Sequence, residues 1–134
     1  MKTDLLDFEI LVPDGVVSRE QVSSLEAEDA SGRFGICPHH EPLFSVLAPA
    51  VLVYRLANGQ ERYAAVDGGV LLVEHGRASI VSREALTSAR LEDVADKARE
   101  LLAARRAVER STSSAFAELE AALAKQLGQI EGRK

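Results

Sequence analysis

The chain has 134 residues, of which 46% are hydrophobic and 28% charged, so it allows one domain or one small domain with an appendage. Its formal net charge of −5 argues against a nucleic-acid-binding protein, because phosphate backbones are bound by basic surfaces. No apolar run approaches a membrane span and no signal peptide precedes the first residues, so we expect a cytosolic chain that meets a membrane only through a larger complex. Cys37 is the single cysteine, which is compatible with a reducing compartment.

The first part of the chain predicts short strands separated by turns. Apolar residues occupy every second position from Leu6 to Val12, which predicts a half-buried strand that stops at Pro13-Asp14-Gly15. A short strand after Gly32 and another from Leu43 are expected to flank an irregular segment, and the second should end near Pro49. The short strands expected in this region are 6–12, 16–17, 22–27, 33–36 and 43–47.

Two hairpins follow in the sequence. Asn58-Gly59 lies between apolar runs at 51–56 and 61–66, and this pair favours a two-residue type I′ loop. Asp67-Gly68-Gly69 predicts another turn, and His75-Gly76 separates two further strands. Many short strands at this spacing are typical of an antiparallel β-sandwich or a partly closed barrel.

The segment Gly32–Leu43 is the least regular part of the strand region. It holds two glycines, two prolines and two adjacent histidines, which no regular helix tolerates. Pro38 and Pro42 also lack the amide donor that a central strand needs. We expect a rigid elbow that faces the surface, where recognition sites often lie.

The hydrophobic period changes to three and four residues from about Ser88, and the charge changes with it. Residues 1–87 carry a net charge of −6 and residues 88–134 a net charge of +1. We expect a first helix up to the hydroxyl-rich run 111–114, and a second helix from there to Leu127, ended by Gly128. The fold class predicted is α+β, with an N-terminal antiparallel β-sandwich over 1–87 and a C-terminal antiparallel two-helix hairpin over 88–134 that docks weakly.

The elbow carries a resemblance to a known family. Gly32, Gly35, Ile36, Pro38, His40, Pro42 and Leu43 match the pattern G-x-x-G-(I/V)-x-P-x-H-x-P-L, and Gly68-Gly69-Val70-Leu71 and Ser79-Ile80-Val81 add to it. Together with the predicted fold, these residues resemble the epsilon subunit of F-type ATP synthases, called delta in mitochondria. The resemblance implies a non-catalytic rotor subunit on the cytoplasmic side of a bacterial inner membrane, which couples ion flow to ATP synthesis and needs no cofactor.

The resemblance also implies where the partners bind. The gamma subunit would contact His40, Leu43, Phe44 and Ser45, and the ring of c subunits would face Ser31, Gly32 and Arg33. The C-terminal hairpin in relatives can extend toward the alpha and beta subunits of the head and inhibit ATP hydrolysis. In this chain its inhibitory contacts would come from the basic residues Arg99, Arg105, Arg106 and Arg110.

Some bacterial relatives bind ATP through (I/L)-D-x-x-R-A at the start of the first helix. The matching stretch here is Leu91-Glu92-Asp93-Val94-Ala95-Asp96, in which Ala95 replaces the arginine that would face phosphate. Because arginine is hard to replace in planar phosphate recognition, no nucleotide site is expected.

Two other function classes stay open at this point. The run Cys37, His39, His40 and Glu41 contains possible metal ligands and suggests a small metal-dependent jelly-roll enzyme, although adjacent histidines on an extended backbone point apart and no metal site is expected. No nucleophile with a neighbouring base is visible in the sequence. The third class is a generic β-sandwich adaptor whose hairpin binds an unrelated partner.

Overall fold

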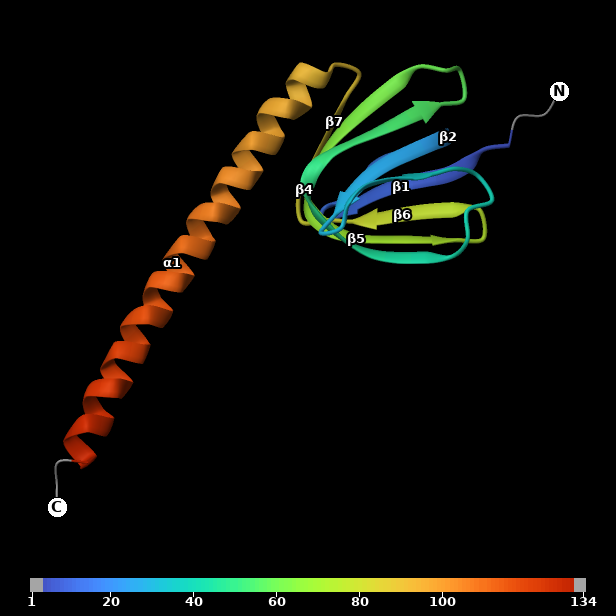
Figure 1. Cartoon of the computed structure of the whole chain (residues 1–134). Helices are drawn as coiled ribbons and strands as arrows, with labels where there is room; N and C mark the ends of the chain where they lie inside the picture. Colours follow the sequence, from blue (N-terminus) through green and yellow to red (C-terminus); the bar gives the residue numbers. More distant parts are fainter. Residues whose placement is uncertain (1–3, 132–134) are drawn as a thin grey trace. The chain divides into compact units, whose positions relative to one another are not determined.

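The structure is a computed structural model that describes the backbone of residues 4–131 and the side chains of residues 4–128. It contains seven strands followed by one long helix (Figure 1). The chain divides into two compact units, Met1–Leu102 and Ala103–Lys134, and each is described by itself. The elements are β1 (Leu6–Val12), β2 (Gly15–Asp29), β3 (Gly32–Ile36), β4 (Leu43–Leu56), β5 (Glu61–Glu74), β6 (Arg77–Val81), β7 (Ala85–Ser88) and α1 (Leu91–Glu131).

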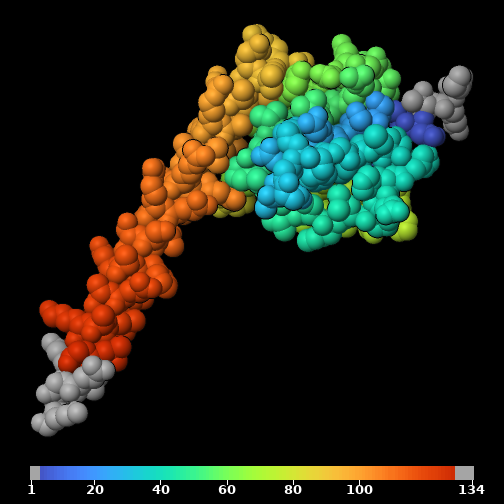
Figure 2. Space-filling model, viewed as in Figure 1, coloured from blue at the N-terminus to red at the C-terminus, as the bar shows by residue number. Residues whose placement is uncertain are grey.

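Five of the strands close into a ring. Their order is β1-β6-β5-β4-β2, and β1 also pairs with β2, while β3 is attached to β2 and β7 to β5. The expected N-terminal β-domain is therefore confirmed, although β1 and β6 pair in parallel and not all pairs are antiparallel as predicted. The space-filling view shows the atoms of this unit closely packed at its surface (Figure 2).

Three of the predicted strand ends are wrong, because the strands continue where an end was expected. Residues 16–27 belong to one strand, β2, and β4 runs on through Pro49. Pro49 is tolerated because the β2–β4 ladder is irregular there, while the β4–β5 ladder continues through the pair Pro49 and Asp67. β5 likewise runs through Gly68 and Gly69, whose φ angles of 67° and 117° let the strand bend without ending.

Both predicted hairpins are present, but the turn type of the first differs from the expectation. The first loop has a positive φ of 90° at Gly59 and none at Asn58, so it is not type I′. Leu56 O accepts from Gly59 N at 2.9 Å and Leu56 N donates to Gln60 O at 2.8 Å, which makes a type I turn followed by a glycine bulge. The type I′ signature lies instead at His75 and Gly76, with φ angles of 51° and 73°.

The core fills the interior of the strand ring. Phe8 and Tyr54 are its largest side chains, and their ring centroids lie 4.9 Å apart. Gly69 marks a second tight contact, because a Cβ built there would lie 2.1 Å from Val81 O. No larger residue fits at Gly69 unless the backbone of β5 or β6 moves.

The predicted two-helix hairpin is wrong: residues 91–131 form the single helix α1. The hydroxyl run 111–114 lies inside it, and so does Gly128. Serine and threonine lower helix propensity by only about 0.5 kcal/mol each, and alanines surround them, so without proline the run does not interrupt the helix. No helical segment in the described part of the chain is apolar enough to cross a membrane.

The first turns of α1 belong to the same compact unit as the strands. Ser88 Oγ accepts from Arg90 N at 3.0 Å and donates to Asp93 Oδ2 at 2.9 Å, which organises the start of the helix. Val94 and Leu101 are buried, and the Lys97 ammonium pairs with the Glu84 carboxylate. The change from strand to helix thus falls at residues 88–91, whereas the compact units divide between Leu102 and Ala103.

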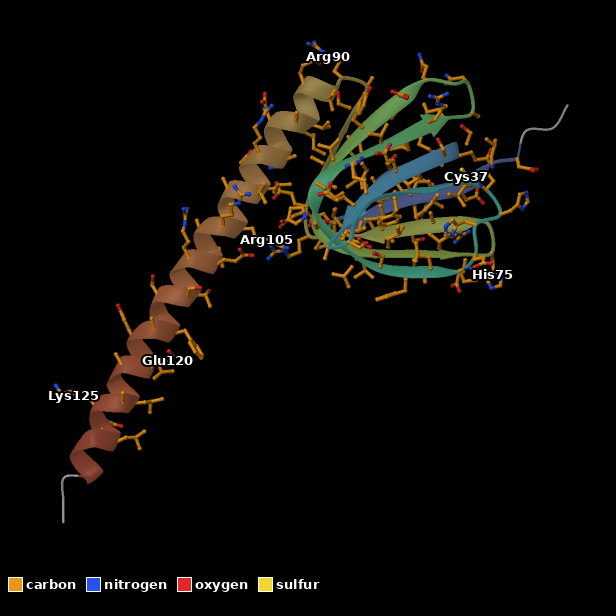
Figure 3. All side chains as sticks on the ribbon, viewed as in Figure 1. Cys37, His75, Arg90, Arg105, Glu120 and Lys125 are labelled. Carbon is orange, nitrogen blue, oxygen red and sulfur yellow. The ribbon has the colours of Figure 1, made fainter. Side chains whose placement is uncertain are left out.

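The second unit exposes its large apolar side chains. Those of Val108, Phe116, Leu119, Leu123 and Leu127 are all more than half exposed. Charged side chains such as Glu120 and Lys125 project from the same helix (Figure 3).

Candidate protein-binding surface

An apolar row crosses the outer face of the strand ring. Successive side chains of a strand point to opposite faces, so the ladder partners of an outward residue are also outward. Val46 pairs with Val70, Val70 with Val81, Val81 with Leu11, and Leu11 with Val16, which aligns aliphatic residues from five strands. Phe44 and Leu72 form a directly paired couple in the next row. We call these seven residues the apolar belt: Leu11, Val16, Phe44, Val46, Val70, Leu72 and Val81.

The belt is exposed to an unusual degree for aliphatic and aromatic residues. Phe44 and Val46 are 67% and 68% exposed, and Val81 is 53% exposed. Scattered apolar residues on a surface need no explanation, but a contiguous set on one sheet face marks an interaction site. The belt is therefore the candidate functional site of the first unit.

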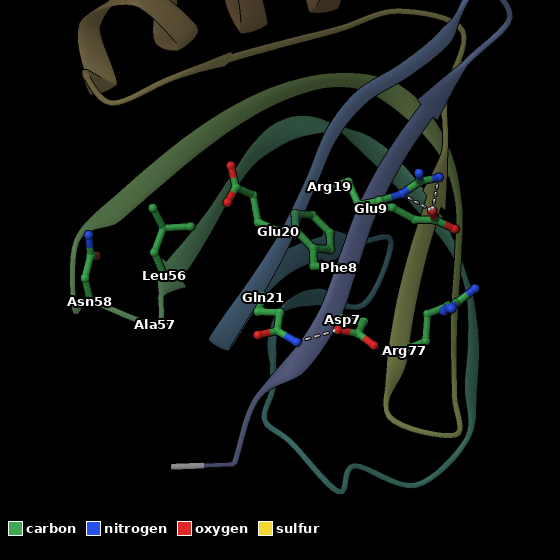
Figure 4. Close-up of a pocket in the computed structure, with 10 residues that line it drawn as sticks. All are labelled: Asp7, Phe8, Glu9, Arg19, Glu20, Gln21, Leu56, Ala57, Asn58 and Arg77. Atoms are coloured by element: carbon green, nitrogen blue, oxygen red, sulfur yellow. Dashed lines mark hydrogen bonds and ion pairs between the residues drawn. The ribbon is translucent and has the colours of Figure 1, made fainter. Parts of the chain in front are cut away.

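A polar row borders the belt on β1, β2 and β6. Glu9 accepts from Ser79 Oγ at 2.8 Å through Oε1. Its Oε2 accepts from Arg19 Nη2 at 3.1 Å (Figure 4). The Ser79 hydrogen bond and then Arg19 hold the pKa of Glu9 below its ordinary value, so this carboxylate is ionised at neutral pH. An apolar centre with a polar rim is the usual anatomy of a protein interface.

A pocket of about 760 Å³ lies beside this rim and is open to solvent. Its lining includes Asp7, Glu20 and Arg77, and several of its charged groups are engaged with one another (Figure 4). Gln21 Nε2 donates to Asp7 Oδ1 at 3.2 Å, and Arg19 is held by Glu9. The pocket brings together no nucleophile and base of the kind that catalysis needs.

The elbow residues separate from one another in the structure. Cys37 is exposed, although cysteine is a residue type that is often buried. His39 Nε2 lies 3.0 Å from Asp4 Oδ2. His40 Nδ1 lies 2.7 Å from the Glu41 carbonyl oxygen. Among the residues that the structure describes, no three His, Cys, Asp or Glu side chains converge as metal ligands would. The metal-enzyme hypothesis therefore finds no ligand set in this part of the chain.

The four residues expected at the gamma subunit point in two directions. His40 and Phe44 are exposed, and Phe44 belongs to the belt. Leu43 packs against the core and Ser45 is buried, so these two side chains support β4 from inside. The rest of the belt was not predicted from the sequence. The continuous apolar run 70–73 is a signal for it, because such a run makes both faces of β5 apolar.

The three residues expected at the c ring lie at the β2–β3 turn. Ser31 and Gly32 are exposed, and Gly32 has a φ of 119°. Arg33 does not project freely, because its Nε donates to Glu26 Oε1 at 2.6 Å and its Nη1 donates to Val51 O at 3.1 Å. Hydrogen bonds from the side chain of Ser31 and then from Ser45 hold the pKa of Asp29, at the base of the turn, below its ordinary value.

The four arginines expected to inhibit hydrolysis all lie on α1. Arg99 Nη1 is bonded to Asp96 Oδ1 at 2.6 Å, Arg105 is half-buried, and Arg106 and Arg110 are exposed. In the segment 91–96, where no nucleotide site is expected, the Asp93 carboxylate accepts a hydrogen bond from Ser88 Oγ.

Comparison with known proteins identifies the class of the fold. The family described as "ATP synthase, Delta/Epsilon chain, beta-sandwich domain" matches residues 5–88. An ATP synthase epsilon chain of Solibacter usitatus is 32% identical over 115 residues, which are 84% of this chain and 78% of that one. An ATP synthase epsilon chain 2 of Cereibacter sphaeroides is 40% identical over 72 residues, which are 53% of this chain but only 49% of the relative.

A solved structure shares the fold. A chain of the Euglena gracilis mitochondrial ATP synthase, in a structure of its OSCP, F1 and c-ring parts, superposes with a TM-score of 0.60 at 22% identity. The superposition covers 63% of this chain and 54% of that one. The chain belongs to the delta/epsilon family of ATP synthase chains. As a member of this family it is a non-catalytic subunit of an ATP synthase.

Proposed function

We propose that the chain is a rotor subunit that couples ion translocation to ATP synthesis, and that it binds the gamma subunit through the apolar belt. The observation that carries this proposal is the alignment of outward-facing aliphatic residues from five adjacent strands. Val16, Val46 and Val81 of this row are exposed, and Leu11 and Val70 are half-buried. A surface of this kind, bordered by the Arg19–Glu9–Ser79 row, suits a stable protein partner better than a small molecule.

Within this interface, exposed and buried residues have different roles. Phe44 is the anchor at the centre of the contact, because large exposed aromatic residues dominate binding energy. His40 contacts the gamma subunit from the elbow. Leu43 and Ser45 act from the opposite face of β4 and hold the exposed residues in register.

The β2–β3 turn faces the c ring in this proposal. Ser31 and Gly32 supply exposed polar and backbone groups at the turn, and Arg33 contributes beside them. The subunit would thereby sit peripherally on the cytoplasmic side of a bacterial inner membrane and reach the membrane only through the complex.

Residues 88–134 form a regulatory arm in this proposal, and residues 1–87 form the part that binds gamma and the c ring. The large apolar side chains that the structure describes on α1 beyond Ala103 are exposed. Arg105, Arg106 and Arg110 lie in the same part of the helix, and Arg99 lies nearer its start. Such a helix suits contact with the alpha and beta subunits, where it would slow ATP hydrolysis.

Binding to a purified alpha–beta–gamma head tests the main proposal. Phe44→Ser and Val46→Ser should each weaken binding about tenfold or more, because anchor truncations cost about 2 kcal/mol. Leu86→Ser is the matched control, since Leu86 is 41% exposed on β7, outside the belt. Normal binding by both belt variants would refute the assignment of this face.

The regulatory role is tested in the same system by ATP hydrolysis. The full chain is compared with a chain that ends at Leu102, which keeps the buried Val94 and Leu101. If both forms bind and only the full chain slows hydrolysis, residues 103–134 inhibit. Equal hydrolysis rates with both forms bound would refute an inhibitory arm.

A further inference from the structure

Asp29, the last residue of β2, joins two separate parts of the sandwich through its carboxylate. Its Oδ1 accepts from the backbone N of Ser31 at 2.8 Å and also from the Ser31 hydroxyl. Its Oδ2 accepts from Ser45 Oγ at 2.8 Å. One carboxylate therefore holds the β2–β3 turn with one oxygen and strand β4 with the other.

Ser45 occupies a particular place on β4. It lies between Phe44 and Val46, the two most exposed residues of the apolar belt, and its own side chain points inward and is 8% exposed. A shift of Ser45 along or across the sheet would move both neighbours, because they share its backbone. Asp29 thus connects the turn to the backbone that carries the belt.

The backbone ladder does not provide this connection alone. The register between β2 and β4 shifts between Glu26 and Asp29, and the next regular pair after Glu26–Val53 is Asp29–Leu47. Bulged ladders lose hydrogen bonds at the shift. A charge-assisted hydrogen bond from Asp29 to Ser45 restores a fixed distance across this interrupted part of the sheet.

Arg33 restrains the other flank of the turn by a separate route. It bonds Glu26 on β2 and the Val51 carbonyl on β4, and neither bond involves Asp29 or Ser45. Loss of Asp29 would therefore free the Ser31 side of the turn while the Arg33 side stays in place.

We propose that Asp29 is a positioning residue that fixes the Ser31–Gly32 turn relative to the part of β4 that carries Phe44 and Val46. This inference rests on the proposed function: if the turn meets the c ring and the belt meets gamma, Asp29 keeps the two contacts in one orientation. It touches neither partner, and it acts through Ser31 and Ser45.

The first arm of the test uses the isolated full-length chain and NMR. Ser45→Ala removes the hydroxyl on β4 without touching the turn, and Asp29→Asn removes the charge. Both variants should shift the amide resonances of Ser31 and Gly32 and speed their hydrogen exchange about tenfold, because a hydrogen bond to a charged group contributes about 1.5 kcal/mol or more. Asp14→Asn, in the exposed β1–β2 turn, is the matched control and should leave those amides unchanged.

The second arm measures assembly. Asp29→Asn should bind the alpha–beta–gamma head within about twofold of the unmodified chain. Complexes that contain Asp29→Asn or Ser45→Ala, formed with the head saturated by the variant, should each bind purified c ring about tenfold more weakly. The double variant should lose no more than either single variant, because one link is removed in each case.

The outcomes separate this inference from the function it builds on. If Ser45→Ala leaves the Ser31 and Gly32 amides unchanged, Asp29 does not transmit position across the sheet, and the inference is overturned whatever the partners are. The inference also fails if Asp29→Asn weakens head and c-ring binding equally, since that marks general loss of structure. If the amides respond but the unmodified chain does not bind the c ring, Asp29 positions the turn and the c-ring assignment is the part that is wrong.

Discussion

Replacing Gly69 by alanine tests how the bend in β5 is accommodated. The φ of 117° at Gly69 is a conformation that residues with a Cβ rarely adopt, and adopting it costs about 1–2 kcal/mol. The new methyl group would also lie 2.1 Å from the Val81 carbonyl oxygen and 3.0 Å from its carbon, so backbone must move. Forced repacking of this kind costs about 1–3 kcal/mol, which gives a total loss of about 2–5 kcal/mol.

Gly76→Ala is the matched control for this experiment. Gly76 has a positive φ of 73°, but a Cβ there meets no atom within 4 Å. The control therefore contains the backbone strain without the collision, and it should cost about 1–2 kcal/mol.

The assay is urea unfolding followed by circular dichroism, with the free energy of unfolding extrapolated to water. We expect Gly69→Ala to be less stable than Gly76→Ala by at least about 1 kcal/mol. Equal losses in the two variants would refute the reasoning, because they would show that the approach of β5 to Val81 relaxes at no cost.

Four further predictions concern the free energy of unfolding: two compare buried with exposed side chains, and two concern its dependence on pH. Ile80→Ala, in the core, should lower the free energy of unfolding by about 2–5 kcal/mol, whereas Phe44→Ser in the belt should change it by less than about 1 kcal/mol in the same urea assay. Val94→Ala should lower the free energy of unfolding by about 2 kcal/mol, because Val94 is fully buried. Leu123→Ala changes an exposed residue on the same helix and should lower it little. Similar losses in the two variants would contradict the burial of the first turns of α1. Hydrogen bonds from Ser31 and then Ser45 keep the pKa of Asp29 in the folded chain below its ordinary value of about 3.9. The ionised Asp29 therefore stabilises the fold fully above that ordinary value, and this contribution is lost as the pH falls through the folded pKa. In Asp29→Asn the free energy of unfolding should depend less steeply on pH on the acid side. Pairing with Glu84 raises the folded pKa of Lys97, so its stabilisation is present below the ordinary value of about 10.4 and is lost as the pH rises through the folded value; an unchanged alkaline limb in Lys97→Gln would contradict this pairing.

Local patterns predicted the position of most strands but not where strands continue through a bend. Alternation identified β1, and the apolar runs around His75-Gly76 identified the second hairpin. Pro49 and Gly68-Gly69 were read as ends because each normally stops a strand, and only the pairing with distant strands shows that the ladder goes on. The closure of β1 on β2 and β6 depends on contacts far apart in sequence, which no local pattern contains.

The helical region shows the opposite difficulty. Residues 111–114 carry four hydroxyl side chains. Such a run ends a helix only where tertiary contacts offset the helical hydrogen bonds that are lost. In the structure all four are exposed within α1, and the preference of the alanine-rich flanks for helix is decisive.

The candidate site was predicted only in part because burial alternates along β4. The sequence placed Leu43, Phe44 and Ser45 together, but a strand turns alternate side chains to opposite faces, and only Phe44 reaches the surface fully. The belt residues on β1, β2, β5 and β6 became visible only through the register of five strands.

The pairing of the belt strands has a consequence for the subunit before it joins its complex. A newly made chain carries an exposed apolar face in solution, and open strand edges beside such a face favour pairing with other chains. Along the belt, in the described part of this chain, β1, β5 and β6 have neighbours on both sides, whereas residues 43–46 of β4 pair only with β5 and residues 16–21 of β2 pair only with β1. The two open edges therefore lie beside Phe44 and Val16, and a partner seated on the belt would shield the places where an unassembled chain is most prone to pair with another.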